Sequence, residues 1–323
     1  MRLALAAAFV LAACGPIGVP ERTFTFGSSA SPSAAGGTSP AAWRRVADIT
    51  TPRSEVAAAV FRGVVYVVGG FGGGNIAETY VADKWSAAPQ YPIAVDHAMA
   101  AGVDTAGTPG LYVFGGNVNG VSVARSFRFF GDQGWREIAP MPAPRSQAAA
   151  VAIGGRIYIV GGAQGDRLVS PTYMYDTATD RWTTAASIPT PRDHLAAAAI
   201  DGRVCAVGGR KLSLLQNLAT FECYDPAADA WRSMPDAPTA RGGVGAATIG
   251  SRLFVAGGEQ PLGTFKEIDI FDSATSSWTR GPNLPTSRHG LGVIAVGSTL
   301  YVMSGGPTPG GSQTAVCEAL DVR

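Results

Sequence analysis

One pattern recurs six times along this chain and restricts what it can fold into. Its clearest copy starts at Pro144-Arg145, runs through apolar residues to Ile153, turns at Gly154-Gly155, and continues through Tyr158 to Gly161-Gly162. The positions equivalent to Tyr158 are 46 to 49 residues apart, at Tyr66, Tyr112, Tyr158, Cys205, Phe254 and Tyr301. The tryptophans keep a second register, at Trp43, Trp85, Trp135, Trp182, Trp231 and Trp278. A unit of this size cannot bury a core alone, so the repeats are predicted to pack side by side.

Each repeat is predicted to form four antiparallel strands. Residues 148–153 are small and continuously apolar, as in a strand that is buried on both faces. The glycine pair at 154–155 supplies the positive φ angles of a two-residue hairpin, and the second strand covers residues 157–160. A third strand over residues 172–176 ends in an aromatic residue followed by Asp, and Trp182 opens a fourth, outer strand.

A period near 50 with a glycine doublet, an aromatic residue and a tryptophan at fixed offsets resembles the kelch repeat, over residues 43–323. The resemblance implies an all-β, six-bladed kelch-type β-propeller, within the superfamily that includes galactose oxidase. The last repeat ends at Arg323 without a tryptophan strand, whereas Trp43 precedes the first repeat. We therefore expect residues 43–49 to add the outer strand of the last blade and close the ring. Closure hides the sheet edge that an open repeat array would expose, so a monomer is predicted.

The first 42 residues indicate export and a tether. A positive charge and a short apolar run precede Leu11-Ala12-Ala13-Cys14, which resembles the lipobox of bacterial lipoproteins. This resemblance implies a signal peptide over residues 1–13, a lipid on Cys14 and, because Gly15 is not Asp, anchoring at the outer membrane or cell surface. An ordinary signal peptide with an incidental cysteine is the alternative. Residues 14–42 are rich in Gly, Ser, Pro and Ala and predict a flexible tether.

Composition and motifs exclude several functions. Charged residues make up 15% of the chain and the formal net charge is +1, so nucleic-acid binding is not expected. There is no Ser-His-Asp order, phosphate-binding glycine loop or HExxH motif, and no cofactor is predicted. Cys205 and Cys223 lie on neighbouring strands of the fourth repeat, where export permits a disulfide as the alternative to two buried thiols.

Five arginines mark one face of the predicted propeller. Each lies 13 residues before the aromatic position of its repeat, at Arg53, Arg145, Arg192, Arg241 and Arg288, and Val95 takes this place in the second repeat. Strand alternation puts them on the same face as the variable loops after the glycine doublets, where binding residues usually lie. A ring of guanidinium groups at a channel mouth would attract carboxylates. Alternatively, the arginines bond backbone carbonyls and tie adjacent blades together.

Neighbouring polar residues complete the predicted ligand site. Asp96-His97 and Asp193-His194 occupy matching places in repeats two and four, and we assign Asp96, His97 and His194 to the site together with the five arginines. Glu55, Gln147 and His289 lie nearby. No metal site is predicted, because His289 is one residue out of register with the other two histidines.

The kelch resemblance implies two kinds of function. Kelch proteins that bind acidic peptides imply a non-catalytic platform for a protein, peptide or anionic glycan. The kelch-type sialic acid mutarotases imply the alternative, an enzyme in which an arginine anchors a carboxylate and Glu55, His97 or His194 moves a proton. A channel pocket sized for one sugar would favour the enzyme.

Overall fold

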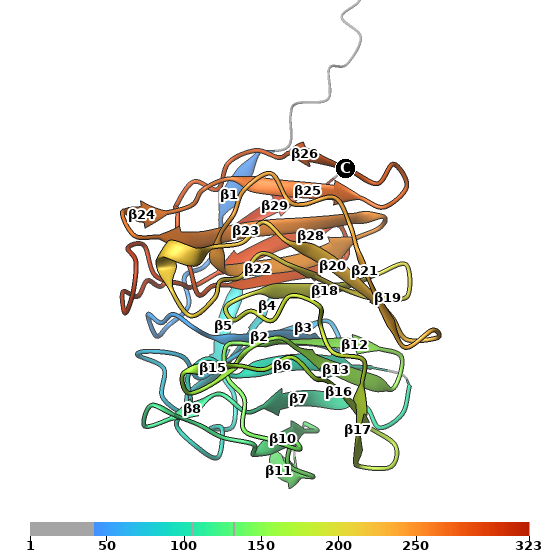
Figure 1. Ribbon diagram of the computed structural model, residues 1–323. Coiled ribbons are helices and arrows are strands. Elements are labelled where there is room, and N and C mark those ends of the chain that lie inside the picture. The colour runs from blue at the N-terminus through green and yellow to red at the C-terminus, as the bar shows by residue number, and fades with distance from the viewer. Residues whose placement is uncertain (1–41, 105, 132, 323) are drawn as a thin grey trace, which may run out of the picture. The chain divides into compact units, whose positions relative to one another are not determined.

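The computed structural model describes residues 42–104, 106–131 and 133–322, which fold into a six-bladed β-propeller (Figure 1). The predicted signal peptide, Cys14 and nearly all of the tether lie outside the described residues. Blades one to three are, from inner to outer strand, β2(Ala57–Phe61) β3(Val64–Val68) β4(Ala77–Val81) β5(Lys84–Ala87); β6(Met99–Val103) β7(Gly110–Phe114) β10(Ser126–Phe129) β11(Trp135–Ile138); and β12(Ala149–Ile153) β13(Arg156–Val160) β16(Thr172–Asp176) β17(Arg181–Ala185).

The other three blades follow the same antiparallel plan. They are β18(Ala196–Ile200) β19(Arg203–Val207) β20(Phe221–Asp225) β21(Ala230–Ser233); β22(Gly242–Ile249) β23(Arg252–Gln260) β25(Ile268–Asp272) β26(Ser277–Arg280); and β27(Gly292–Val296) β28(Thr299–Met303) β29(Cys317–Asp321) β1(Trp43–Arg45). Short pairs extend the loops after three glycine doublets: β8(Asn117–Val118) with β9(Val121–Ser122), β14(Ala163–Gln164) with β15(Arg167–Leu168), and β24(Gly263–Thr264) with the end of β23. The only helical segment among the described residues is the 3₁₀ turn η1(Leu214–Gln216), and none of their helices could span a membrane.

The ring closes as the sequence predicts. Strand β1 pairs antiparallel with β29, with Trp43 opposite Leu320. Two backbone hydrogen bonds extend this contact beyond the strand, from Val46 N to Cys317 O at 3.1 Å and from Ile49 N to Ala315 O at 3.0 Å. The inner strands neighbour one another in a closed cycle, in which β2 lies beside both β6 and β27. The predicted outer strand in the last blade is confirmed.

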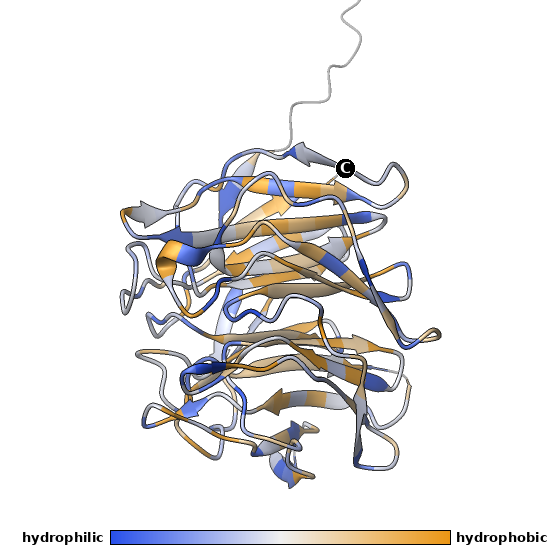
Figure 2. Cartoon of the chain, in the orientation of Figure 1, coloured by the Kyte–Doolittle hydropathy of each residue, from blue (hydrophilic) through white to orange (hydrophobic). Residues whose placement is uncertain are grey.

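The core lies between blades rather than at one centre. Each hydrophobic cluster combines side chains from adjacent blades, as where Phe114 of blade two packs with Tyr175 and Trp182 of blade three. Figure 2 shows the hydrophobic stretches running along the strands. All six tryptophans also donate their indole N–H to a backbone carbonyl of the preceding blade, at 2.7–2.9 Å. These aromatic residues therefore act as core and as ties between blades.

Cys205 and Cys223 face each other directly across β19 and β20 and form a disulfide. Of the two alternatives left by the sequence, the bridge is the one present. Cys317 is a buried free thiol.

Candidate functional site

The five arginines lie inside the propeller, and not at an open mouth as the sequence analysis expected. Arg53, Arg145, Arg192, Arg241 and Arg288 are each at most 1% exposed. Burial lowers the pKa of all five guanidinium groups, to about 10 for Arg53 and Arg145. The contacts of these arginines are made with other residues of the protein. Their binding of a ligand therefore stays a prediction.

Each arginine ties two blades together. Its backbone carbonyl accepts a hydrogen bond from the glycine doublet of the preceding blade, as from Gly162 N to Arg192 O at 2.8 Å. Its side chain enters its own blade, where Arg192 donates to Gly208 O at 2.7 Å and Ala206 O at 3.0 Å. Four of the five guanidinium groups also pair with a buried carboxylate on the third strand: Arg53 with Glu78, Arg192 with Glu222, Arg241 with Asp269 and Arg288 with Glu318. These contacts are those of the alternative given in the sequence analysis, in which the arginines tie adjacent blades together.

The repeat without an arginine shows that an apolar pair can replace this ion pair. Val95 is 3% exposed and belongs to the same hydrophobic cluster as Phe127, which occupies the carboxylate position of blade two. The backbone tie is kept, because Gly70 N donates to Val95 O at 2.8 Å. In blade two, hydrophobic core packing thus takes the place of the ion pair. The missing arginine does not widen the channel entrance. Arg145 is intermediate, since its guanidinium lies 4.2 Å from the ring centre of Tyr173 and contacts no carboxylate among the described residues.

The residues two positions after the arginine series form a ring around the axis. Six backbone hydrogen bonds of 2.7–3.1 Å join them head to tail, in the order Glu55, His97, Gln147, His194, Gly243 and Gly290. All six have positive φ angles, between 52° and 70°. This conformation is easy for glycine and strained for the other four. The absence of a side chain at Gly290 makes room for Glu55, whose Oε1 would lie 2.4 Å from a Cβ at that position.

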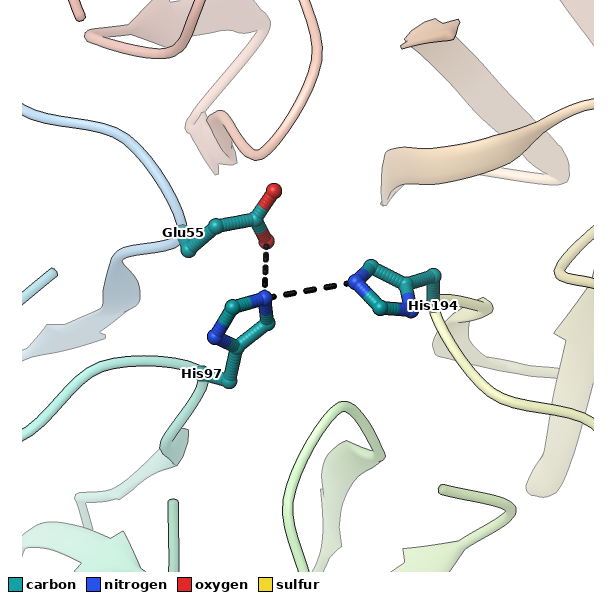
Figure 3. Close-up of side chains that lie close together, drawn as sticks. All are labelled: Glu55, His97 and His194. Atoms are coloured by element: carbon teal, nitrogen blue, oxygen red, sulfur yellow. Dashed lines mark hydrogen bonds and ion pairs between the residues drawn. The ribbon is translucent and has the colours of Figure 1, made fainter. Parts of the chain in front are cut away.

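Three side chains of this axial ring converge (Figure 3). His97 Nε2 lies 3.3 Å from Glu55 Oε2 and 3.3 Å from His194 Nε2. The Nδ1 atoms face carboxylates, His97 to Asp96 at 2.6 Å and His194 to Asp193 at 2.5 Å. Asp96 and Asp193 thereby orient the two rings so that both Nε2 atoms point at the axis.

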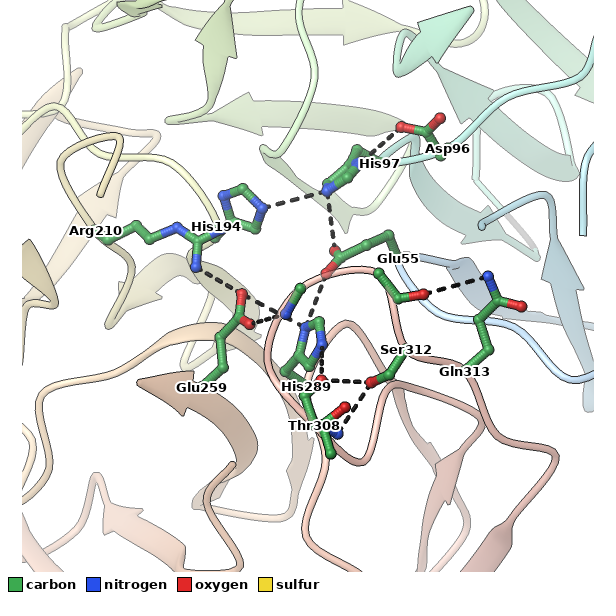
Figure 4. A network of polar contacts seen from close by, with 12 residues as sticks. Glu55, Asp96, His97, His194, Arg210, Glu259, His289, Thr308, Ser312 and Gln313 are labelled. Carbon is green, nitrogen blue, oxygen red and sulfur yellow. Dashed lines mark hydrogen bonds and ion pairs between the residues drawn. The ribbon is translucent and has the colours of Figure 1, made fainter. Parts of the chain in front are cut away.

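A second cluster of polar side chains, centred on His289, lies beside the first (Figure 4). His289 Nδ1 is 3.0 Å from Glu55 Oε1 and 3.6 Å from Glu259 Oε1, and its Nε2 donates to Thr308 O at 3.1 Å. Arg210 donates to Glu259 Oε1 at 2.7 Å. A carbonyl and a carboxylate can only accept, so both ring nitrogens of His289 carry protons and this residue is a cation.

The pKa values follow from burial and these neighbours. Burial alone would raise the pKa of Glu55, but His97, His289 and His194 hold it well below the usual range. Burial opposes protonation of His97 and His289, yet the surrounding carboxylates raise the pKa of both. For His194 burial prevails over Asp193 and lowers the pKa. The two histidines at the axis therefore differ in basicity, although their sequence contexts match.

The cavity at the axial ring is small. It is lined by all six ring residues and holds about 90 Å³. That is room for about three waters, at about 30 Å³ each, and is well below the 300–1,000 Å³ typical of small-molecule pockets. This part of the channel has room for an ion with a few waters.

The structure brings together only part of the predicted site. Asp96, His97 and His194 are at the axis, and Glu55 and His289 join them, whereas the arginines lie in the layer between blades. Sequence reasoning missed Arg210 and Glu259, which come from the loops after the doublets of blades four and five. For the residues of the axial ring a weak signal existed, because polar residues occupy the second position after the arginine series in four of six repeats.

Comparisons with known proteins agree with this architecture. Residues 81–236 match the KLHDC2/KLHL20/DRC7 Kelch-repeats domain and residues 240–285 match the Kelch motif. The fold and these repeats define the class: the chain is a six-bladed β-propeller built from kelch repeats.

Two individual proteins are similar to parts of this chain or to its fold. Kelch repeat and BTB domain-containing protein 1 of camelpox virus (strain CMS) is 26% identical over 148 residues, which are 43% of this chain and 25% of that protein. The chain thus spans about a quarter of that relative. The solved structure titled "Structure of YjhT" superposes with a TM-score of 0.73 at 16% identity, covering 84% of this chain and 95% of that one. This likeness shows the fold.

Proposed function

We propose that this chain is an exported, lipid-anchored kelch propeller that binds a protein or peptide partner on its loop face, defined as the face formed by the loops after the glycine doublets. Kelch propellers generally serve as protein-interaction platforms, and the observation that carries the proposal is where this chain exposes its large apolar side chains. Among the described residues these are Val81, Val121, Leu212, Leu215 and Leu262. All but Val81 lie on the loop face, with Leu215 84% and Leu262 97% exposed.

We define an apolar rim by the three exposed leucines on the loops of blades four and five, which are Leu212, Leu215 and Leu262. Asn217 Nδ2 donates to Glu259 O at 2.7 Å and links these two loops. Leu212 N donates to Asp193 Oδ1 at 2.7 Å, so the rim is also tied to the residue that orients His194. Exposed apolar side chains beside polar groups on a rigid scaffold are typical of protein-binding sites.

The carbohydrate-active enzyme remains the second candidate. Its support is that Glu55, His97 and His194 line the channel cavity, where a proton-transferring group would have to be. Against it stand the size of the cavity and the engagement of the arginines with internal carboxylates and carbonyls. An anionic glycan is therefore less well supported than a peptide.

The test is a peptide-binding experiment with matched leucine variants. Peptides selected from a random display library against the full chain are expected to bind Leu215→Ser/Leu262→Ser about 100- to 10,000-fold more weakly, since burying each of the two leucines contributes about 1.5–3 kcal/mol. The control is Val81→Ser, which removes a 50% exposed apolar side chain from the opposite face. Equal binding to both variants contradicts the proposal. Saturable stabilisation by sialic acid in a thermal-shift titration, with no peptide enriched, would instead support the enzyme.

The anchor is tested separately. The full chain produced in a bacterial host is expected to incorporate labelled fatty acid and to partition into detergent, and Cys14→Ser should abolish both. Labelling that persists in the Cys14→Ser variant contradicts lipidation at this residue.

A further inference from the structure

The convergence of Glu55, His97 and His194 has the geometry of a metal site. Their ligand atoms all lie within 4.8 Å of one another, and two of the separations are 3.3 Å. Zinc bonds of about 2.0–2.1 Å arranged as a tetrahedron place neighbouring ligand atoms about 3.3–3.4 Å apart. Two of the three separations therefore match the edge of a tetrahedral zinc site, and the third, between Glu55 and His194, is at most 4.8 Å.

The tautomers of the two histidines point to the same conclusion. Asp96 and Asp193 accept hydrogen bonds from the Nδ1–H groups, which leaves both Nε2 atoms at the axis to bind a metal, and at His97 the ion would displace the proton that faces Glu55. Glu55 Oε2 adds a third electron-pair donor aimed at the same point. Carboxylate–histidine pairs of this kind are the usual outer partners of metal-bound histidines. The aspartates are held in turn, Asp96 by Asn117 Nδ2 at 3.2 Å and Asp193 by Leu212 N.

The charge of the buried group also calls for a divalent cation. Four carboxylates gather here, those of Glu55, Asp96, Asp193 and Glu259, against the two cations Arg210 and His289. When His97 and His194 bind a metal through Nε2 they are neutral, and two negative charges then remain in a largely buried setting for the ion to balance. Uncompensated buried charge is costly, and one divalent ion balances it.

We propose that Glu55 Oε2, His97 Nε2 and His194 Nε2 bind one divalent transition-metal ion of the zinc class on the propeller axis. The site has three protein ligands, as in zinc sites that keep an exchangeable position. That position would open to the 90 Å³ cavity, which has room for a water or for one donor atom of a ligand. His289 Nδ1 holds the other oxygen of Glu55 at 3.0 Å and positions this ligand. The inference is independent of the apolar rim, since it uses none of its leucines.

The test is a Zn²⁺ titration of the full chain, produced without a polyhistidine tag and freed of metal with a chelator. The chain has only three histidines, so histidine-dependent binding is easily assigned. One Zn²⁺ per chain is expected by equilibrium dialysis with metal analysis. His97→Asn and His194→Asn should each weaken binding by about 100-fold or more, beyond the 10- to 100-fold expected for the outer partner in Asp96→Asn. Asparagine is chosen because it tolerates the positive φ angles of these positions.

Gln147→Asn is the matched control, because Gln147 belongs to the same ring and cavity but is not one of the proposed ligands. It should bind Zn²⁺ as the wild type does. A second readout is Co²⁺, whose visible absorption should report a tetrahedral site and disappear in His97→Asn. The proposal is overturned if the wild type binds no stoichiometric Zn²⁺, or if His97→Asn and Gln147→Asn bind equally. If His97→Asn does not fold, the Zn²⁺ affinity of Asp96→Asn is the deciding measurement. An affinity equal to that of the wild type overturns the proposed metal site.

Discussion

Replacing Arg192 should destabilise the propeller more than replacing Arg145, although the two occupy the same repeat position. Arg192 forms an ion pair with Glu222 at 2.5 Å in a fully buried setting, and it also donates to three carbonyls. Arg145 donates to two carbonyls and stacks on Tyr173, without a carboxylate partner. Arg192→Met therefore leaves a buried carboxylate whose remaining partner is the Thr190 hydroxyl, at 2.8 Å, whereas Arg145→Met leaves none.

The magnitudes follow from that difference. Removing one partner of a buried ion pair typically costs about 3–5 kcal/mol. Losing hydrogen bonds to two carbonyls and a cation–π contact costs about 1–3 kcal/mol, because it leaves no charged group without a partner. We therefore expect Arg192→Met to lower the free energy of unfolding by about 2 kcal/mol more than Arg145→Met does. Arg192→Met/Glu222→Met should recover part of the loss, as blade two already replaces this pair with Val95 and Phe127.

Urea unfolding at 25 °C, followed by tryptophan fluorescence and circular dichroism, measures these free energies. Coincident transitions and equal m values are needed for the comparison to hold. The reasoning is refuted if Arg145→Met is as destabilising as Arg192→Met, or if the double variant is less stable than Arg192→Met alone. In that case the carboxylate contact would not be the source of the difference.

Three further predictions concern the scaffold. Reducing the disulfide between Cys205 and Cys223, which are 18 residues apart, should lower the free energy of unfolding by about 3 kcal/mol, as urea unfolding with and without reductant can measure. Deleting residues up to Thr50 removes β1 and exposes the edge of β29, so light scattering should detect oligomers or aggregates; a stable monomer would contradict the closure. Gln147→Gly should leave stability unchanged or raise it by up to about 1 kcal/mol, because glycine relieves the positive φ angle, and a loss above that size would show that the side chain serves the fold.

Most of the fold could be predicted from the sequence because the same physical constraints repeat six times. Strands expected over residues 148–153, 157–160 and 172–176 are found as β12, β13 and β16, within one residue. Glycine pairs and runs of small apolar residues mark these boundaries locally, without long-range information. The closing strand followed from the unmatched Trp43 and the missing last tryptophan.

The site was predicted less well because its determinants are not local. Sequence position gave the correct face for the arginines but not their depth, which depends on acidic partners near the start of the third strand. Comparing repeats would have revealed this pairing, since Glu78, Glu222, Asp269 and Glu318 accompany arginines whereas Phe127 accompanies Val95. The axial ring was harder to predict, because glutamate, histidine and glutamine rarely adopt positive φ angles.

The axial ring is itself an argument that this site has a function beyond the fold. Blades five and six place Gly243 and Gly290 in the left-handed conformation at no steric cost, and the backbone ring is complete there. The other four blades keep Glu55, His97, Gln147 and His194 in the same conformation, which costs a non-glycine residue about 1–2 kcal/mol. Backbone geometry alone gives no reason to prefer these side chains to glycine. Three of the four converge on one point, and two of those three are oriented by adjacent aspartates. Strain of this kind is concentrated at functional sites, so the chemistry of this propeller is to be sought on its axis, with the buried arginines as its support.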